Sequence, residues 1–271
     1  MTTQARLIVL GTGSAFPTRS YNECFIVETD GGRLLVDGGG GNAIINILER
    51  MDVDIRSLHD LFVTHTHTDH ILGAVWFIRR VVQFAIEKKY PGRLNVYGNR
   101  DVIEALRQIC RLTFLMAYYE KMESIVDFRV VAPGDSAEIA GCSVRFIDCR
   151  SANVNQTGFR MTLPDGQTLF CLGDEALTAE NAPEVAGADY LVCGAFCRYE
   201  DREVFRPYEK HHFTVRDVAT TARNCGIKNL IIMHCEDRTP ASCRQTLYAE
   251  EAAAYYKGKI IVPEDGTMIS L

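Results

Sequence analysis

The sequence lacks several features that would mark a membrane, secreted or disordered protein. No apolar run reaches the length of a membrane span, and the opening residues, MTTQARLIVLGTGS, do not have the layout of a signal peptide. No Pro- or Ser-rich linker, repeat or low-complexity tract divides the chain. Because 47% of the 271 residues are hydrophobic, we expect one cytoplasmic domain over residues 1–271 with an ample core.

The chain also has fewer basic than acidic residues, with 29 Lys and Arg and 35 Asp and Glu, which gives a net charge of −6. Such a chain is poorly suited to capturing nucleic acid by long-range charge, although it can still hold a local basic pocket. The composition therefore argues against a general nucleic-acid-binding protein.

C-x-x-C pairs are absent from the ten cysteines, which are scattered mostly through apolar stretches. This distribution favours reduced thiols that pack as small core residues. A metal site at Cys193 and Cys197 is the weaker alternative, since a four-residue spacing alone is a weak signal.

Short apolar runs alternate with amphipathic segments in both halves of the chain. The runs predict strands at residues 6–10, 24–29, 33–37, 61–64, 94–97, 128–131, 143–147, 159–163, 168–172, 190–193, 230–233 and 259–262. Helical spacing predicts helices at 42–51, 69–89, 101–112, 215–225 and 244–256. Strands in runs with helices interspersed predict an α/β (α+β) fold, in which two mixed β-sheets pack face to face with helices outside.

Three of the seven histidines fall within six residues, in the run His65-Thr66-His67-Thr68-Asp69-His70. His65 and His67 follow an expected strand and should point to one side, because strand side chains alternate with period two. Asp69 and His70 open the next helix, whose first turn can aim them at the same point. Imidazole and carboxylate are good ligands for zinc, iron or manganese, so the run predicts a metal site rather than a solvated turn.

The segment T-H-T-H-T-D-H closely resembles the signature of the metallo-β-lactamase superfamily, whose fold is an αββα sandwich. Residues 10–17, LGTGSAFP, resemble the start of its ribonuclease Z-like phosphodiesterase branch. Further landmarks of that branch recur in order along nearly the whole chain, at residues 34–39 (LLVDGG), 172–174 (LGD), 210–214 (KHHFT) and 230–234 (LIIMH). Each later landmark alone is weak, but their order after H-x-H-x-D-H is specific.

The resemblance implies a centre of two divalent metals. The implied ligands are His65 and His67 with a third histidine for the first metal, Asp69, His70 and His234 for the second, and Asp174 as the bridge. Asp37 would brace the site. Asp69 and His212 would be the catalytic residues, with His212 protonating the leaving oxygen. The alternative for His212 is a surface position beside His211.

One implied ligand is missing. In this branch the third histidine lies six positions before the Gly of a Gly-aromatic-Arg run, here GFR at 158–160, and that position is Ala152. A methyl group cannot ligate, so the first metal should bind weakly or not at all. Because the other implied ligands are present, we interpret the chain as an engineered, inactivated form of a functional enzyme. Natural divergence to a one-metal site is the alternative.

Two further departures narrow the substrate. Ribonuclease Z carries a Glu that pairs with the histidine equivalent to His212, whereas this chain has CGAF at 193–196. Ribonuclease Z also often has a long basic arm before the bridging Asp, and residues 158–173 are too few for it. Together with the acidic net charge, these departures argue against tRNA as a substrate.

The remaining candidate for substrate selection is the helical segment at residues 74–123, which carries the aromatic residues Trp76, Phe77, Phe84, Phe114, Tyr118 and Tyr119. Such spacing is typical of a core or a dimer face, so a homodimer is left open, and the alternative is a pocket wall that stacks on a base or acyl group. Arg19, Arg150 and Arg160 are candidates for contacting phosphate.

We therefore predict a metal-dependent hydrolase, and within that class a phosphodiesterase on a small substrate such as a cyclic or short nucleotide. Two other functions stay open: hydrolysis of a lactone or thioester at the same centre, and non-catalytic ligand binding by a protein that has lost its first metal site. His212 discriminates between the two kinds of hydrolase, because a poor alkoxide leaving group needs a proton donor more than an activated ester does.

Overall fold

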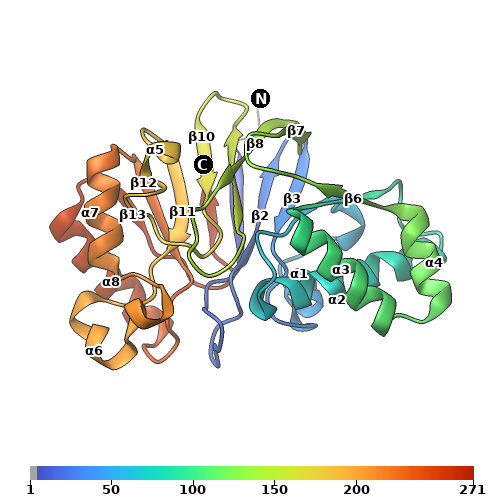
Figure 1. The fold of residues 1–271 in the computed structure, drawn as a ribbon, viewed down its shortest axis with the longest axis horizontal. Helices are drawn as coiled ribbons and strands as arrows, with labels where there is room; N and C mark the ends of the chain where they lie inside the picture. The colour runs from blue at the N-terminus through green and yellow to red at the C-terminus, as the bar shows by residue number, and fades with distance from the viewer. Residues whose placement is uncertain (1–4) are drawn as a thin grey trace.

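The computed structural model describes residues 5–271, which form two seven-stranded β-sheets packed face to face, with helices on both outer surfaces (Figure 1). The first sheet has the order β14-β1-β2-β3-β4-β5-β6. Its strands are β1 (Arg6–Gly11), β2 (Cys24–Thr29), β3 (Gly32–Val36), β4 (Asp60–Phe62), β5 (Leu94–Gly98), β6 (Val126–Val130) and β14 (Met268–Ser270). The predicted architecture of two mixed sheets flanked by helices is confirmed.

The second sheet has the order β13-β12-β11-β10-β9-β8-β7. Its strands are β7 (Ser136–Ile139), β8 (Cys142–Asp148), β9 (Thr157–Thr162), β10 (Thr168–Cys171), β11 (Tyr190–Gly194), β12 (Asn229–Met233) and β13 (Lys259–Ile261). The strands β10, β11 and β12 run parallel, and β9 pairs antiparallel with β10.

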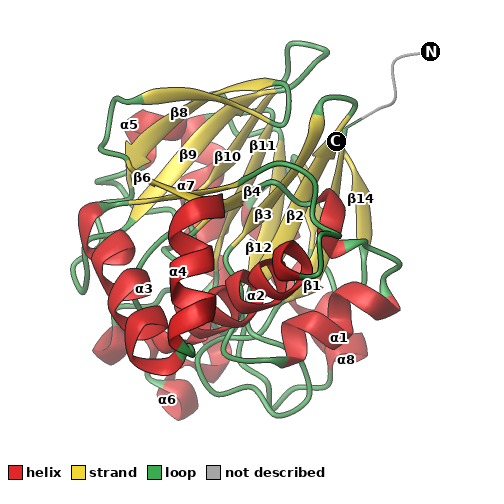
Figure 2. Cartoon of the chain, turned by 90° about the vertical axis from the view of Figure 1, so that its right-hand side faces the viewer, coloured by secondary structure: helices red, strands yellow, loops and turns green. Residues whose placement is uncertain are grey.

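Helices cover the outer face of each sheet. Figure 2 looks onto the first sheet's helices, which are α1 (Ala43–Arg50), α2 (Thr68–Ile86), α3 (Arg100–Thr113) and α4 (Met116–Ile125). The second sheet's side carries α5 (Ala182–Val185), the short α6 (Arg202–Phe205), α7 (Val215–Cys225) and α8 (Ala241–Tyr255). Single 3₁₀ turns occur at Ile55–Ser57, Tyr199–Asp201 and Pro207–Lys210.

Central strands such as β2, β11 and β12 bury both of their faces, which explains why they read as continuous apolar runs. In β2, Phe25 packs in the core between the sheets, whereas Ile26 packs under the helices of the first sheet. Across the space between the sheets, the rings of Phe62 in β4 and Phe146 in β8 lie 5.5 Å apart. The sheets are therefore held together by an apolar layer that all central strands share.

Five elements are missing from the predicted strand and helix ranges: β7, β14, α4 and the short helices α5 and α6, which bury one residue and none. The edge strand β7 buries only Ile139, and β14 is three residues long. In α4, Met122 and Ile125 are the only buried side chains among ten residues. Each element buries too few residues to produce a recognisable apolar period.

The ends of parallel strands position the candidate site. β3 runs parallel to β4, and their carboxyl ends lead into Asp37 and His65. In the other sheet, the carboxyl ends of β10 and β12 lead into Asp174 and His234. The residues that the sequence singles out thus leave the two sheets at the same end of the sandwich.

A close approach between two glycines seats α2 against this end of the first sheet. Gly38 N donates to His70 O at 3.0 Å, and Gly73 N donates to Gly39 O at 2.7 Å. A Cβ atom on Gly38 would lie 2.0 Å from Ala74 N, and one on Gly73 would lie 1.8 Å from Gly38 O. A larger residue at either position would push the first turn of α2 away from the strand ends.

All ten cysteines are free thiols, and eight of them are buried, which confirms the prediction of reduced core residues. Within residues 5–271, Cys193 and Cys197 belong to no group of side chains that could hold a metal. No helix in the described part of the chain is long and apolar enough to cross a membrane.

Candidate metal centre

The H-x-H-x-D-H run leaves β4 and enters α2 directly. His65 lies in the loop and is fully buried, and His67 is the exposed residue that precedes the first turn of the helix. Asp69 and His70 occupy that first turn and are both buried. The local structure therefore presents four potential ligands from six consecutive residues.

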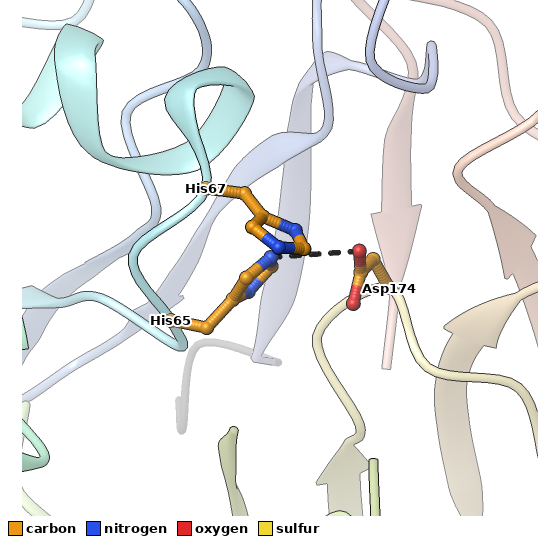
Figure 3. Close-up of side chains that lie close together, drawn as sticks. All are labelled: His65, His67 and Asp174. Atoms are coloured by element: carbon orange, nitrogen blue, oxygen red, sulfur yellow. Dashed lines mark ion pairs between the residues drawn. The ribbon is translucent and has the colours of Figure 1, made fainter. Parts of the chain in front are cut away.

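Two groups of side chains could each hold a metal ion, His65, His67 and Asp174 in one, and Asp69, His70 and His234 in the other. Within each group the ligand atoms all lie within 4.8 Å of one another. Figure 3 shows His65 and His67 reaching from one loop toward Asp174, which comes from the other sheet. The structure thus brings together every metal ligand that the sequence predicts, apart from the histidine missing at position 152.

Asp174 belongs to the first group and also lies close to the histidines of the second. Its Oδ2 is 3.6 Å from His65 Nε2, 3.7 Å from His70 Nε2 and 3.8 Å from His234 Nε2. One carboxylate oxygen therefore faces imidazole nitrogens of both groups, as a bridging ligand must.

The unpaired nitrogens of these histidines fit a metal. His65 Nε2 and His70 Nε2 are buried and have no hydrogen-bond partner among the described residues. A buried polar atom without a hydrogen-bond partner destabilises the fold by roughly 1–3 kcal/mol, so we expect these nitrogens to bind a ligand. Ligands about 2.0–2.1 Å from one tetrahedral zinc are about 3.4 Å apart. This is close to the 3.6 Å and 3.7 Å that separate these two nitrogens from Asp174 Oδ2.

A carboxylate behind the histidines fixes their orientation, as the sequence predicts for Asp37. Asp37 Oδ2 lies 2.9 Å from His70 Nδ1 and accepts a hydrogen bond from Thr64 Oγ1 at 2.9 Å. The same hydroxyl lies 2.9 Å from His65 Nδ1. Asp37 adopts the left-handed backbone conformation, with φ of 57°, at the end of β3. It therefore orients one histidine directly and a second through Thr64, so that each Nε2 faces the centre.

Sequence reasoning missed two further residues that contact the ligands. Glu23 Oε2 lies 3.4 Å from His234 Nδ1, and Glu23 is only 2% exposed. Gln156 Nε2 donates to Asp174 Oδ1 at 2.6 Å. A charged residue directly before the apolar strand β2 was a signal for Glu23, whereas Gln156 lies in a polar loop that gives no signal.

Burial and charge together set the protonation states at the centre. Burial raises the pKa of Asp174, but the imidazoles around it, His65 first, outweigh burial and hold the pKa well below its ordinary value. The pKa of Asp69 is lowered in the same way beside His70. Burial lowers the pKa of His65 to about 4. For His70, burial is outweighed by Asp37, which raises the pKa, so a metal would have to displace that proton.

Ala152 lies in the exposed loop between β8 and β9. Its neighbours Ser151 and Asn153 line a central cavity of about 170 Å³, together with His67, Asp69, Asp174, His212 and His234. Ala152 itself lines an adjoining cavity of about 360 Å³. The group of His65 and His67 therefore has Asp174 as its third member and gains no ligand from position 152.

His212 lies at the centre, not at a remote surface position. Its ring is stacked on Phe196, with centroids 5.2 Å apart and planes at 19°, and its centroid is 5.2 Å from that of His234. Phe196 belongs to the segment 193–196, which has no Glu to pair with His212, so the contact from this segment is aromatic. Burial, followed by the charge of His234, lowers the pKa of His212 to about 4. The neighbouring His211 is exposed.

The three candidate arginines occupy different places. Arg19 lines a cavity of about 550 Å³ that also includes His212. Arg150 forms an ion pair with Asp148 at 3.3 Å and lines the cavity beside Ala152. Arg160 lies on β9 over the ring of Phe170, away from these cavities. The structure thus places Arg19 and Arg150, but not Arg160, beside the site.

The aromatic-rich segment at residues 74–123 comprises most of α2, strand β5, α3 and most of α4. Phe77 is fully buried, whereas Trp76 is 47% exposed and lines an apolar cavity of about 230 Å³ with Arg79, Ile109 and Phe114. Its exposed apolar side chains also include Leu112, Leu115 and Met116. The segment therefore contributes to the core and also presents apolar surface.

Comparison with known proteins identifies a matching family and related sequences. The family described as anti-Pycsar protein Apyc1 matches residues 5–246. The ribonuclease Z of Kineococcus radiotolerans is 26% identical, over 92% of this chain and 88% of that protein. The ribonuclease Z of Streptomyces coelicolor is also 26% identical, over 97% of this chain and 96% of that protein.

Solved structures share the fold over nearly the full length. The metallo-β-lactamase fold protein YhfI from Bacillus subtilis has a TM-score of 0.79 at 17% identity, covering 98% of this chain and 99% of that one. A diphosphatase from the PhnP family has a TM-score of 0.73 at 17% identity, covering 99% of this chain and 98% of that one. Zn²⁺-bound PqqB from Methylobacterium extorquens has a TM-score of 0.73 at 14% identity, covering 98% of this chain and 100% of that one. At these identities the structures establish the fold alone. Because the family match spans most of the residues, the chain belongs to the anti-Pycsar protein Apyc1 family and is a ribonuclease Z-like member of the metallo-β-lactamase superfamily.

Proposed function

We propose that this chain is built as a metal-dependent phosphodiesterase for a small nucleotide, and that Ala152 weakens its first metal site. The observation that carries the proposal is the position of Asp174 Oδ2, within 3.8 Å of imidazole nitrogens from both groups. Two metals about 3.5–4 Å apart, as in two-metal hydrolases, need such a shared ligand.

The donor set suits two divalent metals, with zinc favoured and manganese or iron as alternatives. His65, His67 and Asp174 would hold the first metal, and Asp69, His70 and His234 the second, with Asp174 between them. When bound, such metals lower the pKa of water and stabilise negative charge on phosphoryl oxygens. Asp37 lies 2.9 Å from His70 Nδ1, and the Glu23 carboxylate lies 3.4 Å from His234 Nδ1, so both carboxylates are on the Nδ1 side of imidazoles of the second group.

His212 is the candidate proton donor for the leaving oxygen. Its ring centroid lies 5.2 Å from that of His234, and it lines the central cavity with Asp69 and Asp174, so it lies close to a leaving oxygen held at the metal centre. A poor alkoxide leaving group needs a proton donor more than an activated lactone or thioester does. This position therefore supports a diester substrate over the rival hydrolase substrates.

Two features support a small substrate and argue against tRNA. The central cavity has a volume of only about 170 Å³. β9 and β10 are joined by a tight turn, closed by a bond of 2.8 Å from Leu163 N to Gln167 O, so this part of the described chain carries no basic arm.

The missing ligand favours a second candidate function, which is non-catalytic binding of a ligand at a one-metal site. Ala152→His separates the two possibilities. If the chain is an inactivated enzyme, this variant should take up about two metals, where the unchanged chain takes up about one or fewer. It should also hydrolyse members of a panel of phosphodiesters, lactones and thioesters. Elemental analysis and the panel assay are read together.

The control is Ala132→His, which adds an imidazole on an exposed loop between β6 and β7. It should change neither metal content nor activity. Two tightly bound metals in the unchanged chain would contradict the assignment of Ala152 as a lost ligand. Two metals without activity in Ala152→His would support the binding protein.

A homodimer remains a prediction, and the exposed Trp76, Leu112, Leu115 and Met116 give it a candidate face. Light scattering on the purified chain measures the oligomeric state, and Leu112→Glu should yield monomers if this face forms the contact.

A further inference from the structure

A second, larger cavity opens beside the central one. It has a volume of about 550 Å³, within the range of about 300–1,000 Å³ that small-molecule sites occupy. Ala15, Lys210 and His212 line both cavities. A molecule whose phosphate lies at the metal centre could therefore place its other end in this side cavity.

Aromatic side chains form part of the wall. Phe205 is half-buried and meets Phe196 edge to face, with ring centroids 6.0 Å apart. Phe196 in turn stacks on His212, so the aromatic contacts continue to the candidate proton donor. Phe16, on the opposite loop, is 93% exposed and also lines the cavity. Such surfaces are suited to a flat ring.

The wall also carries positive charge despite the acidic composition of the chain. Arg19, Lys210 and Arg238 line the cavity, and none of them forms an ion pair within the described residues. Arg238 lies over the Phe205 ring at 5.5 Å. Asp237 and Glu236 offset part of this charge, and the Asp237 carboxylate is held in place by hydrogen bonds that it accepts from the backbone of Thr18, Arg19 and Ser20.

One buried carboxylate in the wall has an unused oxygen. Glu236 is 3% exposed, and its Oε2 accepts hydrogen bonds from Arg238 N at 2.6 Å and Thr239 N at 3.1 Å. Its Oε1 accepts none from any residue that the structure describes. This oxygen is not among the buried atoms that lack a partner, so it is open to the cavity that Glu236 lines, where it suits a ligand that donates an N–H.

We propose that this side cavity, lined by Phe16, Arg19, Phe196, Phe205, Glu236 and Arg238, is the subsite for the nucleobase of the substrate. The base lies against the Phe205 ring, and Glu236 Oε1 accepts a hydrogen from the base's amino group. Lys210, which lines both cavities, faces the phosphate. The inference rests on the proposed function, because it assumes that the substrate is a nucleotide diester.

The test measures binding to the zinc-loaded chain as it stands, by calorimetry, because the missing ligand at position 152 should slow hydrolysis. The probes are adenosine 3′,5′-cyclic phosphate, its purine analogue without the amino group, and a ribose cyclic phosphate without a base. Stacking on one aromatic side chain should make the adenosine probe bind about 5- to 150-fold tighter than the base-free probe.

Phe205→Ala should abolish most of that difference and leave the base-free probe unchanged. Glu236→Gln preserves an oxygen for the two backbone donors and presents an amide N–H₂ to the base, so the preference for the amino group should disappear. Tyr255→Ala removes a partly exposed aromatic ring on α8 that does not line the cavity, and it should bind all three probes as the unchanged chain does.

The outcomes separate the two proposals. If the base adds no affinity, or if Phe205→Ala weakens all three probes equally while circular dichroism shows an intact fold, the base subsite is wrong. The phosphodiesterase proposal would then still stand on cleavage of a base-free diester by Ala152→His. If Phe205→Ala does not fold, Arg238→Gln replaces it, and an unchanged preference for the adenosine probe would overturn the subsite.

Discussion

Gln156 Nε2 lies 2.6 Å from Asp174 Oδ1 and 2.9 Å from the carbonyl oxygen of Leu172. Gln156 and Asp174 are both buried, so this amide holds the carboxylate in one orientation. Oδ2 is then the oxygen that faces His65 and His70. A single side chain outside the two metal-capable groups therefore selects the oxygen of Asp174 that two metals would share.

Gln156→Leu should weaken zinc binding at both sites by roughly 10–100-fold, the usual cost of removing a hydrogen bond behind a metal ligand. Titration against a chromophoric chelator measures the affinity. Gln108→Leu, at an exposed position of α3, is the matched control and should bind zinc as before. Equal affinities in all three proteins would show that Asp174 keeps its orientation without the amide.

Asp37→Ala should weaken zinc binding and also destabilise the fold. Asp37 accepts hydrogen bonds from Thr64 N at 2.8 Å and from Thr64 Oγ1 at 2.9 Å, and it pairs with His70. Leaving these buried donors unpaired should lower the free energy of unfolding by about 1–3 kcal/mol. Urea unfolding of the metal-free chain and a zinc titration check the two effects.

Asp52→Ala is the control for backbone strain, because Asp52 has φ of 55°, close to the 57° of Asp37, but is exposed. Its zinc affinity should be unchanged. If Asp37→Ala and Asp52→Ala lose the same stability and bind zinc equally, Asp37 serves only the turn.

The sequence predicts most of the fold because the central strands and long helices carry their burial locally. β2 reads as apolar throughout, since Phe25 and Ile26 pack on opposite faces of one buried strand. A tight hairpin joins β2 to β3, with Thr29 opposite Gly32. Elements that bury only one or two side chains, such as β7 and α4, leave no such pattern.

The candidate site was likewise predictable only in part. Four of its residues lie within six consecutive positions, and the other predicted ligands match landmarks at strand ends. The contacts of Glu23 with His234 and of Gln156 with Asp174 join loops far apart in sequence, so no local spacing predicts them. The side cavity combines the loop around Arg19, the end of α6 at Phe205 and the loop around Glu236, and of these three residues only Arg19 was a candidate from the sequence.

Glu175 should make the stability of the metal-free chain depend on pH. Burial raises its pKa from 4.5 to about 7, against a smaller opposing effect of its hydrogen bond with Ser151. The folded chain therefore binds this proton more tightly than the unfolded chain does. Its stabilising contribution is complete below about pH 4.5 and is lost as the pH rises through about 7.

Glu175→Gln should accordingly raise the free energy of unfolding at pH 8 relative to the unchanged chain, with little effect at pH 4.5. Urea unfolding in the presence of a chelator measures both. Glu180→Gln alters an exposed carboxylate that lines the same 360 Å³ cavity and should show no such pH-dependent gain. Curves that remain parallel from pH 4.5 to pH 8 would place the titration of Glu175 outside this range.

His212→Ala, tested in the Ala152→His background, should separate proton donation from binding. A positioned general acid typically contributes about 10²–10⁴-fold, so hydrolysis of a dialkyl phosphodiester should fall by that order. A nitrophenyl diester should lose far less, because its leaving anion needs no proton. His211→Ala is the control, since His211 is exposed and lacks the contacts of His212 with Phe196 and His234. The measurement is the steady-state rate on both diesters. Equal losses of rate on the two diesters would assign His212 a binding or structural role. Cleavage of lactones without any diesterase activity would reject the phosphodiester class.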